Sequence, residues 1–161
     1  MTIAATVLDR LEDRDLLAAG LFVDGQWLGR ASDGRTFEVT NPSTGAVLAT
    51  LPDAGVAEAK SAIEAAQRAQ GAWAAKTGKE RAAGLRKLHE LMVAHADDLA
   101  AIMTAEQGKP VAEAKGEVLY GASYVEWFGE EAKRVYGDTI PGHQADKRII
   151  VIKQPVGVVP G

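Results

Sequence analysis

The sequence predicts an α/β fold in which short β-hairpins come first, a layer of helices follows, and a further antiparallel hairpin lies near the C-terminus. Three observations support this fold class. Up to residue 51, apolar segments of strand length flank turn-forming residues, which is typical of hairpins. From Pro52 the apolar period lengthens to about 3.6 residues, which indicates amphipathic helices. A β-branched run at residues 149–152 then indicates a return to strands.

Two strand pairs are predicted near the N-terminus. Asp24-Gly25 separates residues 21–23 from 26–28, and this dipeptide can take the two positive-φ positions of a type I′ turn. The turn NPSTG at residues 41–45 separates a second pair of strands, at 36–40 and 46–51, because its proline cannot donate to a ladder. Ahead of both pairs, the loose helical spacing of residues 6–19 predicts a short amphipathic helix or a frayed leader within the segment 1–20.

A run of helices is predicted from residue 53 to residue 107. Asp53 is a candidate N-cap of the first helix, and Thr77 with Glu80 forms a capping box at the start of the second. The residues expected to face inward are apolar and recur every three or four positions: Val56, Ala59, Ile63, Ala66, Trp73, Leu85, Leu88, Leu91, Met92, Leu99, Ile102 and Met103.

The longest predicted helix begins where Gly108 can end its predecessor at positive φ and Pro110 can take the first helical position. Gly137 is expected to end this helix. Its predicted buried face carries small and branched residues: Val111, Ala114, Val118, Ala122, Val125, Ala132 and Val135.

Large aromatic rings form a second stripe on the same helix. Tyr120, Tyr124 and Trp127 are wide enough either to wall a pocket or to fill a core, and both interpretations stay open at this point. Beyond the helix, extended segments at 138–141 and 148–154 flank the polar loop 142–147. Residues 149–152 are too apolar to lie bare on a surface, so a partner is expected for this hairpin.

Composition argues against several classes of function. The 161 residues carry a formal net charge of −4, with lysine and arginine scattered among acidic residues, which argues against nucleic-acid binding. No apolar run approaches the roughly 20 residues that span a bilayer, and residues 1–10 lack the pattern of a signal peptide. A soluble cytoplasmic protein is therefore expected. The absence of cysteine removes disulfides, thiolate metal sites and any cysteine nucleophile.

Motifs that carry catalysis or bind cofactors are missing from the sequence. Neither G-x-G-x-x-G nor G-x-x-x-x-G-K-S/T occurs, and no serine lies in G-x-S-x-G. His89, His95 and His143 lack the spacing of a metal triad. Adjacent carboxylates such as Glu130 and Glu131 diverge on a helix and are expected to be solvated. No catalytic residue and no cofactor-binding residue is therefore predicted.

Several motifs together resemble a known family. They are LFVDGQW at 21–27, VTNPSTG at 39–45, ERAAGLRKL at 80–88, EQGKP at 106–110, VYGDTIPGHQADKR at 135–148 and IIVIKQPVGV at 149–158. Their order and spacing resemble the N-terminal third of an NAD(P)-dependent aldehyde dehydrogenase, closest to the succinate-semialdehyde dehydrogenase branch. The resemblance covers residues 21–158.

The resemblance implies a chemistry that this sequence does not contain. In the family, a cysteine thiolate attacks the aldehyde, an oxyanion hole that includes an asparagine stabilises the adduct, and hydride passes to NAD or NADP. A glutamate then activates the hydrolytic water. The family's P-W-N-F segment should follow PVGV, but residues 159–161 read VPG. The chain is thus expected to be an N-terminal fragment that lacks most Rossmann strands, binds no cofactor in isolation and is inactive alone.

The resemblance also implies positions for a few residues. Residues 21–136 would form the first part of the nucleotide-binding domain, and residues 137–161 would begin an oligomerisation hairpin. Tyr120, Tyr124 and Trp127 would face the substrate tunnel, although plain core packing is the alternative. Thr40 and Glu106 match positions where some members bind a monovalent cation through main-chain carbonyls.

Association is expected on two independent grounds, the resemblance and the exposed β-branched hairpin. The expected partners are further copies of the chain or intact aldehyde dehydrogenase subunits. A non-catalytic oligomerisation or interaction module is the alternative function, and an independent small enzyme is a third. The helical stripes need an opposing sheet that the family builds from later strands, so the isolated chain is expected to be marginally stable.

Overall fold

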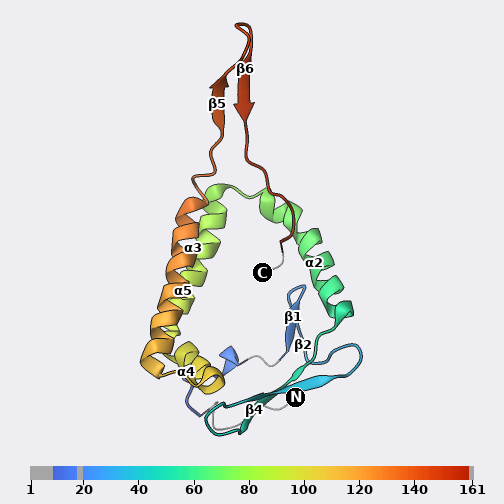
Figure 1. Cartoon of the computed structure of the whole chain (residues 1–161), viewed down its shortest axis with the longest axis vertical. Helices are drawn as coiled ribbons and strands as arrows, with labels where there is room; N and C mark the ends of the chain where they lie inside the picture. The colour runs from blue at the N-terminus through green and yellow to red at the C-terminus, as the bar shows by residue number, and fades with distance from the viewer. Residues whose placement is uncertain (1–8, 18–19, 160–161) are drawn as a thin grey trace.

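Residues 9–17 and 20–159 are described by the computed structural model, and they form helices and separate two-stranded antiparallel sheets (Figure 1). In chain order the elements are η1 (Arg14–Leu16), β1 (Leu21–Val23), β2 (Gln26–Leu28), β3 (Thr36–Thr40), β4 (Val47–Pro52), α2 (Val56–Ala74), α3 (Gly78–Ala94), α4 (Ala96–Gln107), α5 (Val111–Glu131), β5 (Asp138–Pro141) and β6 (Arg148–Val151). The predicted α/β order of hairpins, helices and a last hairpin is confirmed.

The β1–β2 hairpin has the predicted turn. Asp24 has a φ of 52° and Gly25 a φ of 77°, so both central residues take the left-handed conformation that a type I′ turn needs. Leu21 pairs with Leu28, and Phe22 pairs with Trp27. The rings of that second pair lie 5.1 Å apart between centroids, which adds an aromatic cross-strand contact to a very short ladder.

The β3–β4 hairpin packs against the C-terminal end of α4. Leu48 and Ala105 form a small buried cluster between them. At the end of α4, Gly108 has a φ of 76°, as predicted, and a Cβ placed on it would lie 3.0 Å from Cγ of Pro42. The NPSTG turn therefore approaches the helix closely enough to favour glycine at this position.

The helices form one packed group and one separate member. α3 and α4 both pack against α5, whereas α2 contacts the β1 strand and stands apart from the other helices (Figure 1). Gly129 of α5 lies where α3 crosses, and a Cβ there would touch Cβ of Leu85 at 3.4 Å. Alanines 82, 114 and 122 are buried on these helices, because small side chains let helix backbones come close.

Three predicted helix boundaries differ from the structure. The first helix begins after Gly55, not after a cap by Asp53, because the Glu58 carboxylate accepts the N–H of Gly55 at 2.8 Å. Pro110 is the N-cap of α5 and not its first helical residue, and α5 ends at Glu131, well before Gly137. The capping box of Thr77 and Glu80 is confirmed.

The helix or leader predicted at residues 6–19 lies partly outside the described residues. Within residues 9–17 the structure contains the 3-10 helix η1, and this segment is attached to α4 through Asp98. That carboxylate accepts the N–H groups of Glu12 at 3.0 Å and Asp13 at 2.8 Å.

Burial is the property that the sequence predicted least well. Several residues expected to face inward are exposed: Val56, Ile63, Trp73, Leu88, Leu91, Val111 and Val135. Among the described residues no large side chain is fully buried, and most buried positions are alanines. The reason is geometric, since the described strands pair only in hairpins and none of those sheets covers the apolar faces of α2 and α5.

The β5–β6 hairpin projects away from the helices (Figure 1). The second strand ends at Val151, three residues earlier than predicted, and Thr139 pairs with Ile150. Ile150 is 76% exposed and Ile152 is 67% exposed, so the apolar run that was expected to need a cover is uncovered here. Within residues 9–17 and 20–159, no helix has the length and apolar content needed to cross a bilayer.

Candidate functional site

The aromatic stripe of α5 is the main candidate site. Tyr120 and Tyr124 lie one helical turn apart, their hydroxyl oxygens are 2.7 Å from each other, and their rings meet edge to face with centroids 5.0 Å apart. Trp127 continues the stripe and is 66% exposed. The structure thus brings the three predicted residues together on one exposed helix face.

The two tyrosine hydroxyls are joined by a hydrogen bond. The hydrogen bond between Tyr124 and Tyr120, together with a smaller effect of burial, raises the pKa of Tyr124 above its ordinary value. Tyr124 therefore stays protonated at neutral pH, where its hydroxyl can donate and accept hydrogen bonds but does not serve as an anionic nucleophile.

An open cavity of about 880 Å³ lies against this stripe. Its lining adds Phe128 and Arg134 to the three predicted residues, with Glu126 among its carboxylates. The sequence analysis did not include Phe128, although its spacing of four residues from Tyr124 places both on one helix face. The lining combines aromatic rings with hydroxyls and a guanidinium, so it can hold and orient a small molecule, and it contains no thiol that could attack one.

The two residues predicted to bind a monovalent cation lie on neighbouring elements. Thr40 is the last residue of β3, and Glu106 is exposed in the last turn of α4. The contact between Pro42 and Gly108 brings the loop after Thr40 close to the helix end that carries Glu106. Cation binding at this place stays a prediction, since carbonyl ligation leaves no side-chain signature.

The histidines do not form a metal site. His89 Nδ1 lies 3.0 Å from the carbonyl oxygen of Ala122, so this ring joins α3 to α5. His95 lies between α3 and α4, and its Nδ1 is 3.9 Å from a carboxylate oxygen of Asp13. The residues that the structure describes contain no cluster of three or more histidine or acidic side chains that could hold a metal.

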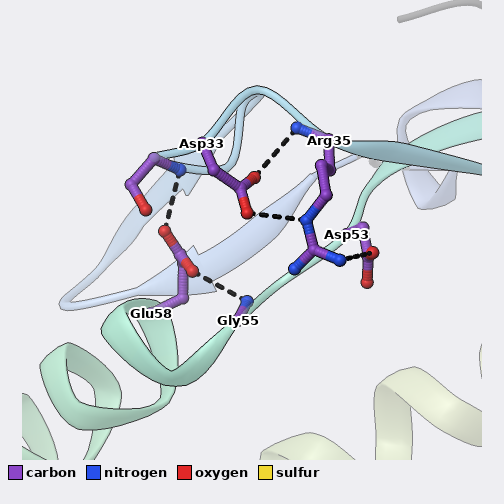
Figure 2. A network of polar contacts seen from close by, with 6 residues as sticks. Asp33, Arg35, Asp53, Gly55 and Glu58 are labelled. Atoms are coloured by element: carbon purple, nitrogen blue, oxygen red, sulfur yellow. Dashed lines mark hydrogen bonds and ion pairs between the residues drawn. The ribbon is translucent and has the colours of Figure 1, made fainter.

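The helix N-terminus after β4 is not available as a phosphate cradle. Residues 53–55 connect β4 to α2 with a single glycine, whereas dinucleotide sites use several. The backbone N–H of Gly55 donates to Glu58 of the same helix, whose other carboxylate oxygen accepts the N–H of Ser32 at 2.8 Å (Figure 2). A carboxylate already occupies the position that a phosphate would take, so the residues around this helix do not fit a nucleotide.

Arginine 35 completes this polar network (Figure 2). Its guanidinium pairs with Asp33 at 2.7 Å and with Asp53 at 3.1 Å. Hydrogen bonds to the Arg35 side chain and backbone lower the pKa of Asp33, and hydrogen bonds from Ser32 and Gly55 lower the pKa of Glu58 to about 2. The network joins the loop before β3 to the start of α2 and serves attachment rather than catalysis.

Comparison with known proteins identifies the family. The model of the aldehyde dehydrogenase family matches residues 27–161. A glutarate-semialdehyde dehydrogenase of Pseudomonas putida is 59% identical over 92% of this chain, and a succinate-semialdehyde dehydrogenase of Escherichia coli, named for NADP(+), is 56% identical over 92%. A solved structure described as an E. coli NADP-dependent enzyme superposes on 90% of this chain with a TM-score of 0.88 and 56% identity.

The shared region is a portion of those proteins. The chain spans 31% of each of the two curated relatives and 30% of the solved chain. The fold of hairpins and helices is thus aldehyde dehydrogenase-like, and it corresponds to an N-terminal portion. The family model matches 135 residues, 27–161, and the high identity confirms the resemblance in the motifs. The chain therefore belongs to the aldehyde dehydrogenase family.

Proposed function

We propose that these 161 residues form the N-terminal portion of a semialdehyde dehydrogenase, an enzyme that oxidises an aldehyde to a carboxylate with NAD or NADP as hydride acceptor. The observation that carries this proposal is the identity of 56–59% to succinate- and glutarate-semialdehyde dehydrogenases over 92% of the chain. Both names describe an aldehyde with a carboxylate at its other end, so a semialdehyde of this kind is the proposed substrate class.

The proposed role of this portion is to bind and orient rather than to react. The exposed rings of Tyr120, Tyr124 and Trp127 would form one wall of the aldehyde tunnel. Two features support this assignment: the stripe borders a cavity of ligand size, and the raised pKa of Tyr124 keeps its hydroxyl neutral at neutral pH. The attacking thiolate, the general base and the nucleotide site would come from outside these residues, since the sequence has no cysteine.

The isolated chain is expected to be inactive. Purified chain is mixed with succinate semialdehyde or glutarate semialdehyde and with NAD or NADP, and absorbance at the wavelength of reduced nicotinamide is followed. We expect no reduction above the buffer rate, because no residue can form the thiohemiacetal that precedes hydride transfer. Clear turnover by the chain alone would contradict the proposal.

A complementation experiment supplies the positive control. The remaining two thirds of the Pseudomonas putida relative is produced alone and together with this chain. Activity only in the combined sample would support the assignment as the missing N-terminal portion. Substitution of Tyr124 by Phe in the combined sample tests the tunnel wall, and we expect a higher KM for the semialdehyde with little change in KM for the nucleotide.

The exposed β5–β6 hairpin favours a second candidate function. Its uncovered isoleucines would let the chain pair with intact aldehyde dehydrogenase subunits as a non-catalytic oligomerisation module. Co-purification of tagged chain with an intact subunit, without gain of activity, distinguishes this role from that of a catalytic portion. Cation binding by Thr40 and Glu106, the domain boundary near residue 136 and a cytoplasmic location stay predictions.

A further inference from the structure

A small cavity that shares no lining residue with the aromatic stripe is used by no part of the proposed reaction. It lies between the segment before η1, the NPSTG turn and α4, and its volume is about 310 Å³. Four apolar side chains, Ala46, Leu48, Ala101 and Ala105, line it together with three polar ones, Arg10, Asn41 and Thr44. The volume is at the lower end of the range of ligand pockets.

The polar side chains offer hydrogen-bond donors to a ligand. The Asn41 side-chain oxygen already accepts the N–H of Ser43 at 2.9 Å and that of Thr44 at 3.3 Å, so its amide nitrogen is the atom left to bind a ligand. The Thr44 hydroxyl oxygen accepts the N–H of Ala46 at 3.3 Å, which leaves its O–H as a donor. Arg10 brings a guanidinium, which can only donate.

The backbone that carries Arg10 is held in place by hydrogen bonds to Asp98. Asp98, whose exposed fraction is 6%, accepts two consecutive backbone N–H groups, those of Glu12 and Asp13. Leu11, between Arg10 and this clamp, is buried. Asp98, Ala101 and Ala105 are three, four and seven residues apart and so lie on one face of α4. The clamp therefore fixes the segment that carries Arg10 beside the helix face that forms the apolar side of the cavity.

We propose that this cavity binds a short aliphatic carboxylate. A carboxylate offers only acceptors, and each of the three polar side chains of the rim has a donor available for it. A bidentate guanidinium pair is the strongest contact such a group can make. A chain of a few methylene groups would cover the alanine and leucine side chains behind the rim. The site is distinct from the aromatic stripe, and its occupancy does not depend on the proposed activity.

The test is a titration of the full 161-residue chain, labelled with ¹⁵N, with sodium butyrate at constant ionic strength. We expect saturable shifts of the amide signals of Asn41, Thr44 and Ala101. Arg10→Gln should weaken binding at least ten-fold. Arg14→Gln is the matched control, because this nearby arginine pairs with Asp9 at 3.1 Å and does not line the cavity. It should change the affinity less than two-fold.

Three further titrations identify what is recognised. Butanol has the alkyl group of butyrate without its charge, and sodium phosphate has negative charge without an alkyl group. Sodium chloride supplies the same cation alone, and this control is needed because Thr40 and Glu106 adjoin the lining residues. Each should bind at least ten-fold more weakly than butyrate. Shifts that do not saturate, equal binding of phosphate, or unchanged binding by the Arg10→Gln chain would overturn the proposal.

Discussion

Single carboxylates attach loop segments to helices through backbone hydrogen bonds. Asp98 attaches the residues before η1 to α4, and Glu58 attaches the loop before β3 to α2, each by accepting two backbone N–H groups. Charge-assisted hydrogen bonds of this kind are short and directional, so they fix position even where few side chains are buried. In a structure whose buried positions are mostly alanines, these contacts carry much of the specificity of the fold.

Glu58 should make stability depend on acidic pH. Its pKa falls from 4.5 to about 2 in the folded chain, so the ionised form is favoured by folding. The contribution is fully present above the unfolded pKa and is lost as the pH falls from about 4.5 to about 2. Urea denaturation midpoints measured across this range should fall less steeply for Glu58→Gln than for the unsubstituted chain.

A matched substitution separates this effect from loss of charge. Glu64 lies on the same helix outside the network of Figure 2, so Glu64→Gln removes one carboxylate without touching Ser32 or Gly55. The pH dependence of the Glu64→Gln chain should follow that of the unsubstituted chain. Equal slopes for all three proteins would show that Glu58 does not contribute.

The cap by Glu58 also shows where local sequence patterns fail. Asp53 was the predicted N-cap because aspartate before a helix is a common cap. The structure instead pairs Asp53 with Arg35, a residue 18 positions upstream that only the hairpin brings near. Local spacing contains no information on such a pair. In contrast, the stripe of Tyr120, Tyr124 and Trp127 was predictable, because residues four and three apart share a helix face whatever lies opposite.

At the scale of elements, turns and some helix ends were predictable from sequence, whereas the ends of α5 and the start of α2 were not. Asp24-Gly25, Gly108 and the capping box at Thr77 are all present as predicted, because each depends on residues within a few positions of one another. The buried faces of α2 and α3 were not predictable, because burial depends on which other element packs against the helix. Leu88 and Leu91 have helical spacing yet stay exposed, because the sheets in the described residues pack elsewhere.

The capping box should contribute measurably to α3. Thr77 accepts the backbone N–H of Glu80 at 3.3 Å through its hydroxyl, while the Glu80 side chain accepts the N–H of Thr77 at 2.7 Å. Thr77→Ala removes the hydroxyl and should lower the free energy of unfolding by about 1 kcal/mol. Urea denaturation followed by circular dichroism measures the change, with the m-value expected to stay constant.

Thr77→Ser is the control for this prediction, because serine keeps the hydroxyl and caps at least as well as threonine. The midpoint of the serine variant should stay close to that of the unsubstituted chain. If alanine and serine gave the same midpoint, the hydrogen bond to Glu80 would not be the source of the stability.

At the scale of the whole molecule, the described residues form a frame whose apolar faces remain open. Exposed large apolar side chains occur on α2, on α5 and along the β5–β6 hairpin. Each fully buried side chain of this kind stabilises a fold by about 1.5–3 kcal/mol. Because these side chains are exposed, the described residues lack that stabilisation. This agrees with a chain that spans 30–31% of its relatives, whose remaining residues would supply the cover.

The exposed hairpin should drive association of the chain with itself. Sedimentation velocity over a range of concentrations should detect oligomers of the unsubstituted chain, because Ile150 and Ile152 lie uncovered on one strand and the residues after it. Ile150→Lys should weaken association about ten-fold or more, since it removes the apolar contact and places like charges together.

His143→Lys serves as the control for that experiment. It adds the same charge to the loop at 142–147 of the same hairpin but leaves the paired strands unchanged. Its association should match that of the unsubstituted chain. A monomer at all concentrations, or equal weakening by both lysines, would argue against docking through the strands.

Helix α2, which stands apart from the other helices, has a consequence for the order of assembly. Glu58 attaches its first turn to the loop before β3, and its last turn leads into the capped start of α3. Between these ends it contacts β1, and Arg68 pairs with Asp24 at 3.0 Å. The attachments at both ends of α2 therefore set the distance between the elements that it joins. In the proposed enzyme, the residues that complete the fold would therefore pack against a helix whose two ends already have fixed positions.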